Sequence, residues 1–417
     1  MPKFPATPRH TMRRALVFLL FVIFVAATSA PQGSRAQEQQ RPRRVGTPPA
    51  GGQANPPATP RQTPTKTPAG EEVDEDDVVR VETQLVSVPA VVTDREGKPL
   101  TGLRADNFLV FEDGRPQKIA NFSTMEAPFE VALLLDTSGS TRQDVGLIRR
   151  AALAFVEALR PGDRVAVISF STRQEDKDTR LATVEVKTPL TDDREELTAA
   201  IESIGSSNGT PFYDGLERVA KEIFREPPSE KVRGRRALVA LTDGVDSTSE
   251  ADFDEALARI KRAGLVTYFV QVNTESFVED RLMADCEDGG GLRLSRAQLQ
   301  RYRRLFASRA DAADFSNFCQ MGPFERMHIS RTLYKVARDE MNRLARDTGG
   351  NTFPVADLRD ARRAFRQVAE EIGTQYSLGY YSSNPTRDGS FRTIRVQVRG
   401  VKDAQVRARE GYQAPKG

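Results

Sequence analysis

The sequence predicts an α/β fold: a doubly wound, mostly parallel β-sheet flanked by a small β-sandwich built from the N- and C-terminal segments. From about residue 130 onward, short apolar runs alternate with amphipathic helical patterns, which is typical of a parallel sheet with helices on both faces. Some runs, such as 131–135, are continuously apolar and therefore suit strands buried on both faces. Strand-like segments return on either side of this unit, so we expect the two flanks to pair with each other.

The α/β unit defines the region in which a binding site is expected. Its expected strands are 131–135, 164–170, 183–187, 237–241, 265–272 and 351–355. Its expected helices are 145–159, 194–204, 213–224, 252–263, 332–346 and 358–372. We expect 183–187 to be an edge strand. Ligands of such sheets bind at the carboxyl ends of the strands.

The flanks are short β units. Expected strands are 79–88, 91–93 and 108–112 in the N-terminal flank, and 376–381, 391–398 and 404–407 in the C-terminal flank. Asp113-Gly114 is a strong signal for a tight turn. The folded part therefore divides into an N-terminal β unit at 78–127, an α/β domain at 128–373 with an insertion at 274–330, and C-terminal strands at 374–412.

Residues 1–36 have the pattern of a secretory signal peptide. Arg13 and Arg14 precede an apolar run at 15–27, and small residues follow, with Ala36 as the preferred cleavage site. The run is about 13 residues, short of the ~20 that a spanning helix needs. We expect the mature chain to be periplasmic or secreted, without a membrane span. Retention of the uncleaved segment as an anchor is the alternative.

The segment 37–77 is expected to be a disordered linker. It is rich in proline up to residue 70 and ends in an acidic run at 71–77, and it has no apolar periodicity. The first 36 residues hold five basic residues and no acid, so removing them changes the net charge from +3 to −2. Such a near-neutral chain carries no electrostatic footprint for nucleic acid.

The insertion at 274–330 interrupts the alternation of strands and helices. It contains a basic helix candidate at 297–307 and both cysteines, Cys286 and Cys319. In an oxidising compartment the two could form a disulfide, and two separate buried thiols are the alternative.

Oxygen-bearing side chains gather at the predicted carboxyl edge of the sheet. Asp136, Ser138 and Ser140 follow the strand at 131–135 directly, at spacings of two residues. Oxygen ligands suit a hard cation such as Mg²⁺, although Ser and Asp are also ordinary helix N-caps. Two further residues belong to the same edge: Thr210 precedes a predicted helix, and Asp243 follows the strand at 237–241.

Together these segments resemble the von Willebrand factor A family and its metal-ion-dependent adhesion site, over about residues 128–373. The resemblance implies that Ser138 and Ser140 bind a Mg²⁺ or Mn²⁺ ion directly, and that Thr210 binds it directly or through water. It further implies that Asp136 and Asp243 hold coordinating waters. Asp214 would be a support residue behind Thr210. An open coordination position would then accept an Asp or Glu carboxylate of a protein partner.

The flanks carry a narrower resemblance. Residues 92–103, 106–108 and 112–114, together with 375–381 and 388–392, are similar to a bacterial group of exported von Willebrand factor A-related proteins. The group's function is poorly defined. The similarity therefore supports the fold and export more than a particular role, and the insertion at 274–330 departs from its pattern.

An enzyme is the less favoured interpretation. His328 is the only histidine that remains after signal removal, and Ser138 lies in no G-x-S-x-G context. No P-loop lysine motif is present. We expect a non-enzymatic, adhesion-type binding protein. The main alternative is an extracytoplasmic scaffold whose metal is structural and whose insertion or β flanks bind partners. The sequence leaves the ligand and the oligomeric state open.

Overall fold

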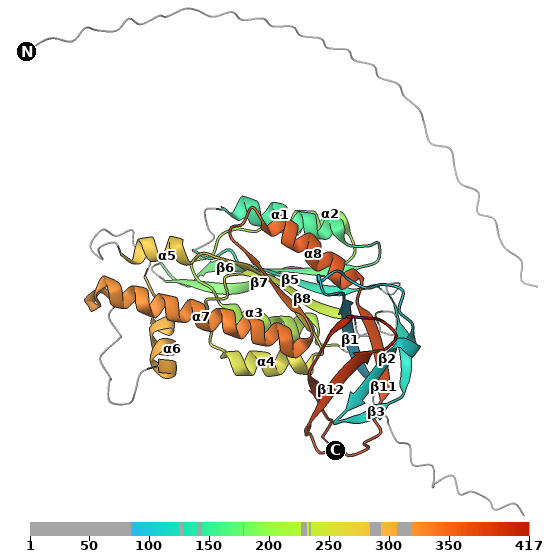
Figure 1. Ribbon diagram of the computed structural model, residues 1–417. Coiled ribbons are helices and arrows are strands. Elements are labelled where there is room, and N and C mark those ends of the chain that lie inside the picture. The colour runs from blue at the N-terminus through green and yellow to red at the C-terminus, as the bar shows by residue number, and fades with distance from the viewer. Residues whose placement is uncertain are drawn as a thin grey trace, which may run out of the picture. The chain divides into compact units, whose positions relative to one another are not determined.

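The computed structural model describes residues 85–124, 128–139, 144–177, 179–226, 232, 235–283, 293–306 and 318–416. The expected signal peptide at 1–36 and linker at 37–77 lie outside these residues. Within the described ranges the strands form one six-stranded and two four-stranded sheets. The larger sheet lies between layers of helices, and the smaller sheets form a β unit beside it (Figure 1).

The six-stranded sheet confirms the predicted α/β architecture. In spatial order its strands are β10 (Asn351–Val355), β9 (Val266–Val272), β8 (Arg236–Thr242), β5 (Glu130–Leu135), β6 (Arg164–Gln174) and β7 (Arg180–Thr191). All neighbours are parallel except β6 and β7, which form a long antiparallel hairpin with β7 at the edge. Every residue of β5 and β8 is buried, as their continuous apolar runs predict.

Helices cover both faces of this sheet. One face holds α1 (Val145–Ala158), α2 (Arg194–Glu202) and α8 (Ala361–Gly373), and the other holds α3 (Phe212–Arg218), α4 (Phe253–Arg262) and α7 (Pro323–Thr348). Successive residues of β5 alternate between the two cores: Leu133 packs with α1 and α8, and Leu134 with α3 and α4. A short π-helical segment, Val219–Ile223, continues α3.

The insertion differs from its prediction at its C-terminal end. The helix expected at 332–346 begins at Pro323, so residues 323–330 of the expected insertion belong to α7. Pro323 occupies the first turn, where a missing N–H is tolerated. The remaining described elements are α5 (Glu275–Leu282), which was not predicted, α6 (Arg296–Phe306) and a 3₁₀ turn at Phe318–Gln320.

The two flanks pair as expected. Their strands are β1 (Leu85–Thr93), β2 (Phe108–Glu112), β3 (Arg115–Gln117), β4 (Ile119–Ser123), β11 (Tyr376–Tyr381), β12 (Phe391–Val398), β13 (Gln405–Ala408) and β14 (Gly411–Gln413), with a 3₁₀ turn at Ala105–Asn107. β1 pairs with β11 and β13, and β2 pairs with β12. The prediction of a break at Pro89 is wrong: β1 runs through it, because β13 joins β1 only from Ala90 onward.

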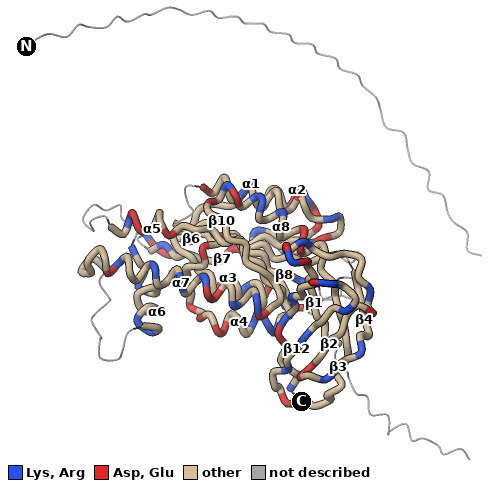
Figure 2. Tube along the Cα trace, in the orientation of Figure 1, with Lys and Arg blue, Asp and Glu red and all other residues tan. Residues whose placement is uncertain are grey.

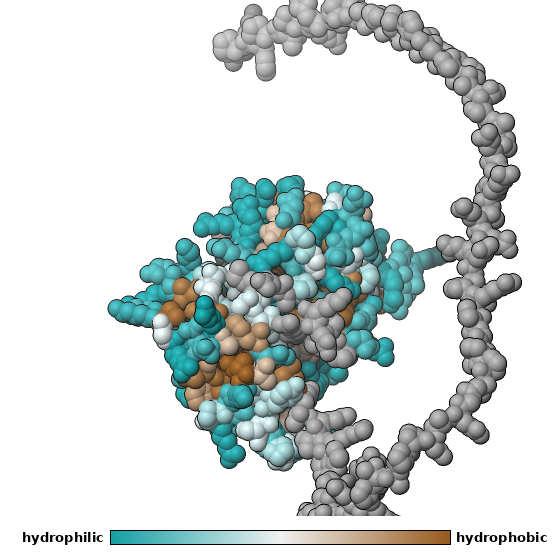
Figure 3. Space-filling view, turned by 90° about the vertical axis from the view of Figure 1, so that its right-hand side faces the viewer, coloured by the Kyte–Doolittle hydropathy of each residue, from teal (hydrophilic) through white to brown (hydrophobic). Residues whose placement is uncertain are grey.

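Polar residues dominate the surface of the described part. Basic and acidic residues are intermixed over it (Figure 2). Seen from the side of the β unit, the surface is mostly hydrophilic and has a smaller hydrophobic patch (Figure 3). None of the helices in the described ranges is both long and apolar enough to cross a membrane.

A buried ion-pair cluster fixes the amino edge of the large sheet. Glu130, the first residue of β5, lies opposite Arg164 and Arg236, the first residues of the two neighbouring strands. Its carboxylate accepts hydrogen bonds from Arg164 at 3.0 Å and from Arg236 at 2.8 Å. The Glu130 side chain is 4% exposed and that of Arg236 is 7% exposed. One carboxylate therefore connects three adjacent strands.

Glu130→Ala is expected to lower the free energy of unfolding by about 3 kcal/mol, because removing one partner leaves the Arg236 guanidinium buried without its carboxylate. Urea denaturation followed by circular dichroism measures the change. As a control, Arg95→Ala breaks the exposed pair with Asp403 at 2.6 Å and should cost less than about 1 kcal/mol. Equal losses in the two variants would contradict this assignment.

Candidate metal centre

The candidate site begins where the two central strands end. β5 and β8 are parallel neighbours with Leu135 opposite Leu241, so the residues that follow them emerge side by side. The Asp136 N–H donates to the Leu241 carbonyl at 2.9 Å. Thr242 Oγ1 donates to Asp136 Oδ2 at 2.7 Å, and the two strand ends are thereby joined by side chain as well as backbone.

The first loop turns tightly around Asp136. The Ser138 N–H donates to Asp136 Oδ1 at 3.0 Å, so both carboxylate oxygens are held. Asp136 is 1% exposed and Ser138 is 2% exposed. The structure thus brings two of the predicted residues together in a buried turn. Ser140 lies outside the described residues.

The loop that carries Thr210 is bonded to both strand ends. The Ser207 N–H donates to the Thr137 carbonyl at 2.8 Å, which joins it to the loop after β5. The Thr210 N–H donates to Ser247 Oγ at 2.8 Å, and the Ser247 N–H donates to the Thr210 carbonyl at 3.0 Å. Ser247 belongs to the loop after β8. The three segments identified in the sequence therefore meet at one rim.

Asp214 and Asp246 support this rim in different ways. The Asp214 carboxylate accepts the N–H groups of Glu250 and Ala251, so Asp214 braces the loop after β8 rather than Thr210 itself. Asp246 Oδ2 accepts the N–H of Phe212 at 2.9 Å and that of Tyr213 at 3.3 Å, at the start of α3. Asp246 therefore supports the segment that follows Thr210, a part that the sequence analysis did not assign to it, and the support role of Asp214 stays a prediction. The sequence signal for Asp246 was an acid three residues after Asp243 in a glycine-containing loop.

Asp243 is held by a hydrogen-bond relay that sequence reasoning missed. Its Oδ1 accepts the Val245 N–H at 3.0 Å, and its Oδ2 accepts the Thr274 hydroxyl at 2.6 Å. Thr274 Oγ1 in turn lies 2.7 Å from the Tyr334 hydroxyl. All three side chains are buried. Thr274 follows β9, and Tyr334 lies in α7, 60 residues further along the chain.

Burial, and after it the negative charge of Asp243, raise the pKa of the Asp136 carboxyl to about 7, against the hydrogen bonds from Ser138 and Thr242. Burial likewise raises the pKa of Asp246 to about 6, against the hydrogen bonds from Ser249 and Tyr213. Asp136 and Asp243 are two buried carboxyl groups that repel each other at one rim, so a positive charge placed between them would be stabilising.

The donor set fits a hard divalent cation. Within the described ranges no group of three or more His, Cys, Asp or Glu side chains could hold a metal. The rim instead combines two acids, Asp136 and Asp243, with hydroxyl groups such as those of Ser138 and Thr210. Hydroxyl, carboxylate and water oxygens are ligands of Mg²⁺ and Mn²⁺, whereas Zn²⁺ would want nitrogen or sulfur.

A wide polar groove of about 1160 Å³ lies beside the rim. One wall is formed by the edge strand β7 and the end of β6. The other includes Pro211, which follows Thr210, Ser247, which is bonded to Thr210, and Ser295 of the insertion. Four arginines line it: Arg173, Arg180, Arg218 and Arg296. Arg218 donates to the Val184 carbonyl and Asn208 to the Arg180 carbonyl, so these side chains occupy main-chain acceptors of β7.

Comparison with known proteins agrees with the fold. Residues 130–290 match the family model of the von Willebrand factor type A domain. The chain contains a von Willebrand factor type A domain. Domains of this family are generally protein-interaction modules without enzymatic activity, and many bind a divalent metal. No curated protein matches the chain.

Several solved structures are similar to the chain. The conserved hypothetical protein BatB from Bacteroides thetaiotaomicron is 18% identical, with a TM-score of 0.35 over 58% of this chain and 98% of its own. A von Willebrand factor type A protein from Catenulispora acidiphila is 11% identical, with a TM-score of 0.38 over 80% of this chain and 75% of its own. Because both TM-scores are below 0.5, neither likeness bears on function.

The remaining predicted residues lie in the insertion. Cys319 is disulfide-bonded, and Cys286 lies outside the described residues, so the pairing of the two stays a prediction. His328 is exposed on α7, and its ring meets that of Tyr302 edge-on at 6.3 Å between centroids. This environment is that of a packing residue on a helix surface.

The raised pKa of Asp136 predicts how stability depends on pH. Between pH 4 and 7 the folded chain binds a proton at Asp136 that the unfolded chain releases, so without metal this group's contribution to stability falls as pH rises. The substitution Asp136→Asn removes this pH-dependent contribution to stability. In EDTA, the unfolding free energy of the variant minus that of the wild type should be more positive at pH 7.5 than at pH 4.5. Urea denaturation at both pH values checks this, and a constant difference would contradict it.

Proposed function

We propose that the chain is an exported, non-enzymatic, adhesion-type protein that captures an acidic side chain of a protein partner through Mg²⁺ or Mn²⁺ at this rim. The observation that carries the proposal is the pair of buried acids, Asp136 and Asp243, set among hydroxyl-bearing residues at the meeting point of three loops. A cation would remove their mutual repulsion and the cost of burying their charge.

The residues divide into two roles. Ser138, Ser140 and Thr210 would hold the ion through neutral hydroxyl groups, and Asp136 and Asp243 would act mainly through waters. Since neutral ligands compensate little of the ion's charge, the bound metal would supply an electrophilic position open to a carboxylate from outside. The buried acids keep the hydroxyl groups oriented and the rim electronegative enough to retain the ion.

Export is the second part of the proposal. It is supported by the signal-like pattern at 1–36 and by the narrower resemblance of the flanks to exported bacterial proteins. The disulfide-bonded Cys319 fits an oxidising compartment. The scaffold function remains the alternative, in which the metal stabilises the domain and the insertion or the β flanks bind the partner.

Metal removal distinguishes the two functions. Calorimetry should show Mg²⁺ or Mn²⁺ binding to the wild type and none to Asp136→Ala. Pull-down of partners from a bacterial envelope extract should fail both in EDTA and with the variant. The scaffold function predicts a lower melting temperature in EDTA with capture intact. Absence of metal affinity in the wild type would remove the proposed mechanism.

The groove predicts where the partner lies outside the metal position. Arg173 at the end of β6 and Arg180 at the start of β7 are exposed on the strand wall of the groove, so they suit acidic side chains that flank the captured carboxylate. The double substitution Arg173→Glu and Arg180→Glu should weaken partner capture about tenfold or more and leave Mg²⁺ affinity within about twofold, in surface binding assays and calorimetry. Glutamates introduced at Arg362 and Arg366, exposed on α8, form the control, and equal effects of the two pairs would contradict a role for the groove.

A further inference from the structure

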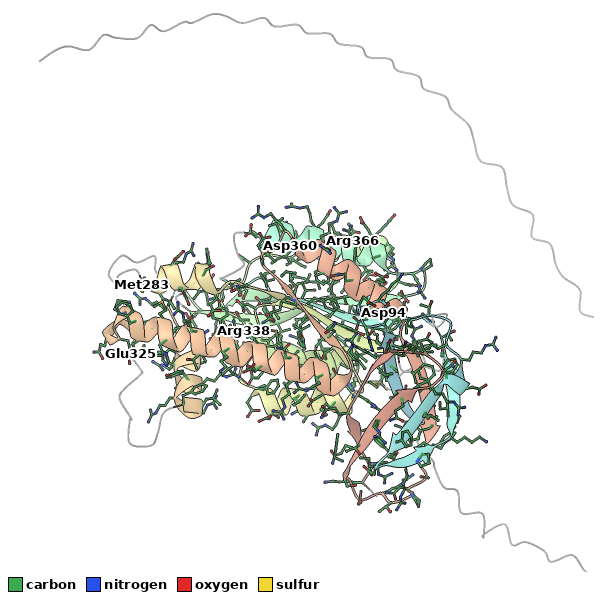
Figure 4. All side chains as sticks on the ribbon, in the orientation of Figure 1. Asp94, Met283, Glu325, Arg338, Asp360 and Arg366 are labelled. Atoms are coloured by element: carbon green, nitrogen blue, oxygen red, sulfur yellow. The ribbon has the colours of Figure 1, made fainter. Side chains whose placement is uncertain are left out.

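The insertion contacts the candidate metal centre at the loop after β8 and at the start of α3. Its described elements are α5, α6 and residues 323–330 of α7, and Tyr334 lies in the next turn of α7. They lie at the end of the domain remote from the β unit, as the positions of Met283, Glu325 and Asp94 show (Figure 4). The carboxyl ends of the central strands face the same end. Nothing in the family resemblance assigns a role to this segment.

The first contact is the relay to Asp243. Thr274 is the N-cap of α5, yet its hydroxyl makes no cap hydrogen bond and is directed to Asp243 Oδ2 at 2.6 Å. A hydroxyl has one proton, and Thr274 uses it on the carboxylate. The Tyr334 hydroxyl, 2.7 Å away, must therefore be the donor to Thr274. The chain of donors runs from α7 through α5 to the rim.

A small hydrophobic core of its own holds this relay in place. It consists of Val278, Leu282, Leu294, Leu299, Met321, Ile329, Leu333 and Tyr334. These residues come from α5, α6, α7 and the segments beside them. Because Tyr334 is itself a member of the cluster, its hydroxyl is positioned by packing and not by the rim alone. An ion pair between Arg338 and Glu275 at 2.8 Å adds a second link between α7 and α5.

The second contact reaches Thr210 indirectly, through Ser247 of the loop after β8. Ser295, immediately before α6, donates its hydroxyl to the Ser247 carbonyl at 2.6 Å. Ser247 is the residue that bonds the Thr210 backbone in both directions. The insertion therefore contacts the loop after β8 at two points, Asp243 and Ser247, and reaches the Thr210 backbone through Ser247.

A third link ties α6 to α3. Arg301 of α6 pairs with Glu340 of α7 at 2.6 Å, and the Tyr213 hydroxyl donates to Glu340 at 2.7 Å. The Arg301 guanidinium also lies over the Tyr213 ring, 4.7 Å from its centroid. Tyr213 is in the first turn of α3, three residues after Thr210.

We propose that the insertion is a clamp that presets Asp243 and the Thr210 loop, and that Thr274 and Tyr334 are positioning residues that set the affinity of the rim for its divalent cation. The proposal rests on the metal site of the proposed function. It goes beyond that function because it assigns the insertion a role, which is control of cation affinity from outside the ligand set.

The physical basis is preorganisation. Both Asp243 oxygens are already engaged by Val245 N–H and Thr274, so the carboxylate can neither rotate nor be drawn away from the rim. Without Thr274 and Tyr334 the ion would have to order the carboxylate on binding. Loss of such outer partners typically costs 10–100-fold in metal affinity.

The test uses the full mature chain with Thr274→Val and Tyr334→Phe, which remove the hydroxyl groups and keep the side-chain volume. Both should weaken Mg²⁺ and Mn²⁺ binding about tenfold or more in calorimetry, and Thr274→Ser should restore it. Without metal, amide hydrogen exchange at residues 243–247 should be faster in both variants than in the wild type. Thr188→Val is the matched control: its buried hydroxyl donates to Glu196 at 2.5 Å, away from the rim, so it should lower the melting temperature and change neither readout.

The clamp is overturned if both variants bind the metal within twofold of the wild type, or if exchange at 243–247 is unchanged. It is likewise overturned if Thr188→Val weakens metal binding as strongly, since a general loss of stability would then explain the effect. A wild type that binds neither cation would instead remove the proposed function. In that case the metal-free exchange alone decides whether the insertion holds the loops.

Discussion

The hydrogen bond from Thr242 to Asp136 joins the ends of the two central strands, and the rest of the rim is arranged around it. Both strands are buried along their whole length, so the residue after each one enters a space that water hardly reaches. An acid placed there resists ionisation, and a second acid, Asp243, increases that resistance. The fold tolerates this arrangement because backbone N–H groups and hydroxyl groups satisfy the carboxylate oxygens.

A further structural unit packs at each of the two edges of the large sheet, the β unit at one and the insertion at the other. At the amino edge, the flanks of the chain form the β unit, where Glu112 is buried with Arg392, Tyr380 and Tyr412 around its carboxylate. At the carboxyl edge, the insertion builds a small core beside the candidate metal centre. α7 connects the two: its 26 residues span about 39 Å at 1.5 Å per residue. The N–H of Glu410, after β13, donates to the carbonyl of Asp347 near its C-terminal end.

The fold could be predicted from the sequence because its signals are local. Apolar runs identified the buried strands, and helical periodicity identified most helices to within a few residues. The start of α7 was missed because residues 323–331 carry few apolar residues of their own, and the partners of Ile329 and Tyr334 come from α5 and α6. The strand through Pro89 was missed for a related reason, since a proline is tolerated where the neighbouring strand begins one residue later.

The sequence by itself determined the order of strands and helices, the flanks that pair, and three segments whose oxygen atoms could meet at the carboxyl edge. It could do so because parallel strands deliver their ends to one edge whatever the side chains beyond. Only the tertiary structure decided that Asp246 caps α3, that Asp214 braces the neighbouring loop, and that Thr274 and Tyr334 hold Asp243. Those contacts join residues up to 60 positions apart, and no local pattern encodes the direction in which a buried hydroxyl group donates its proton.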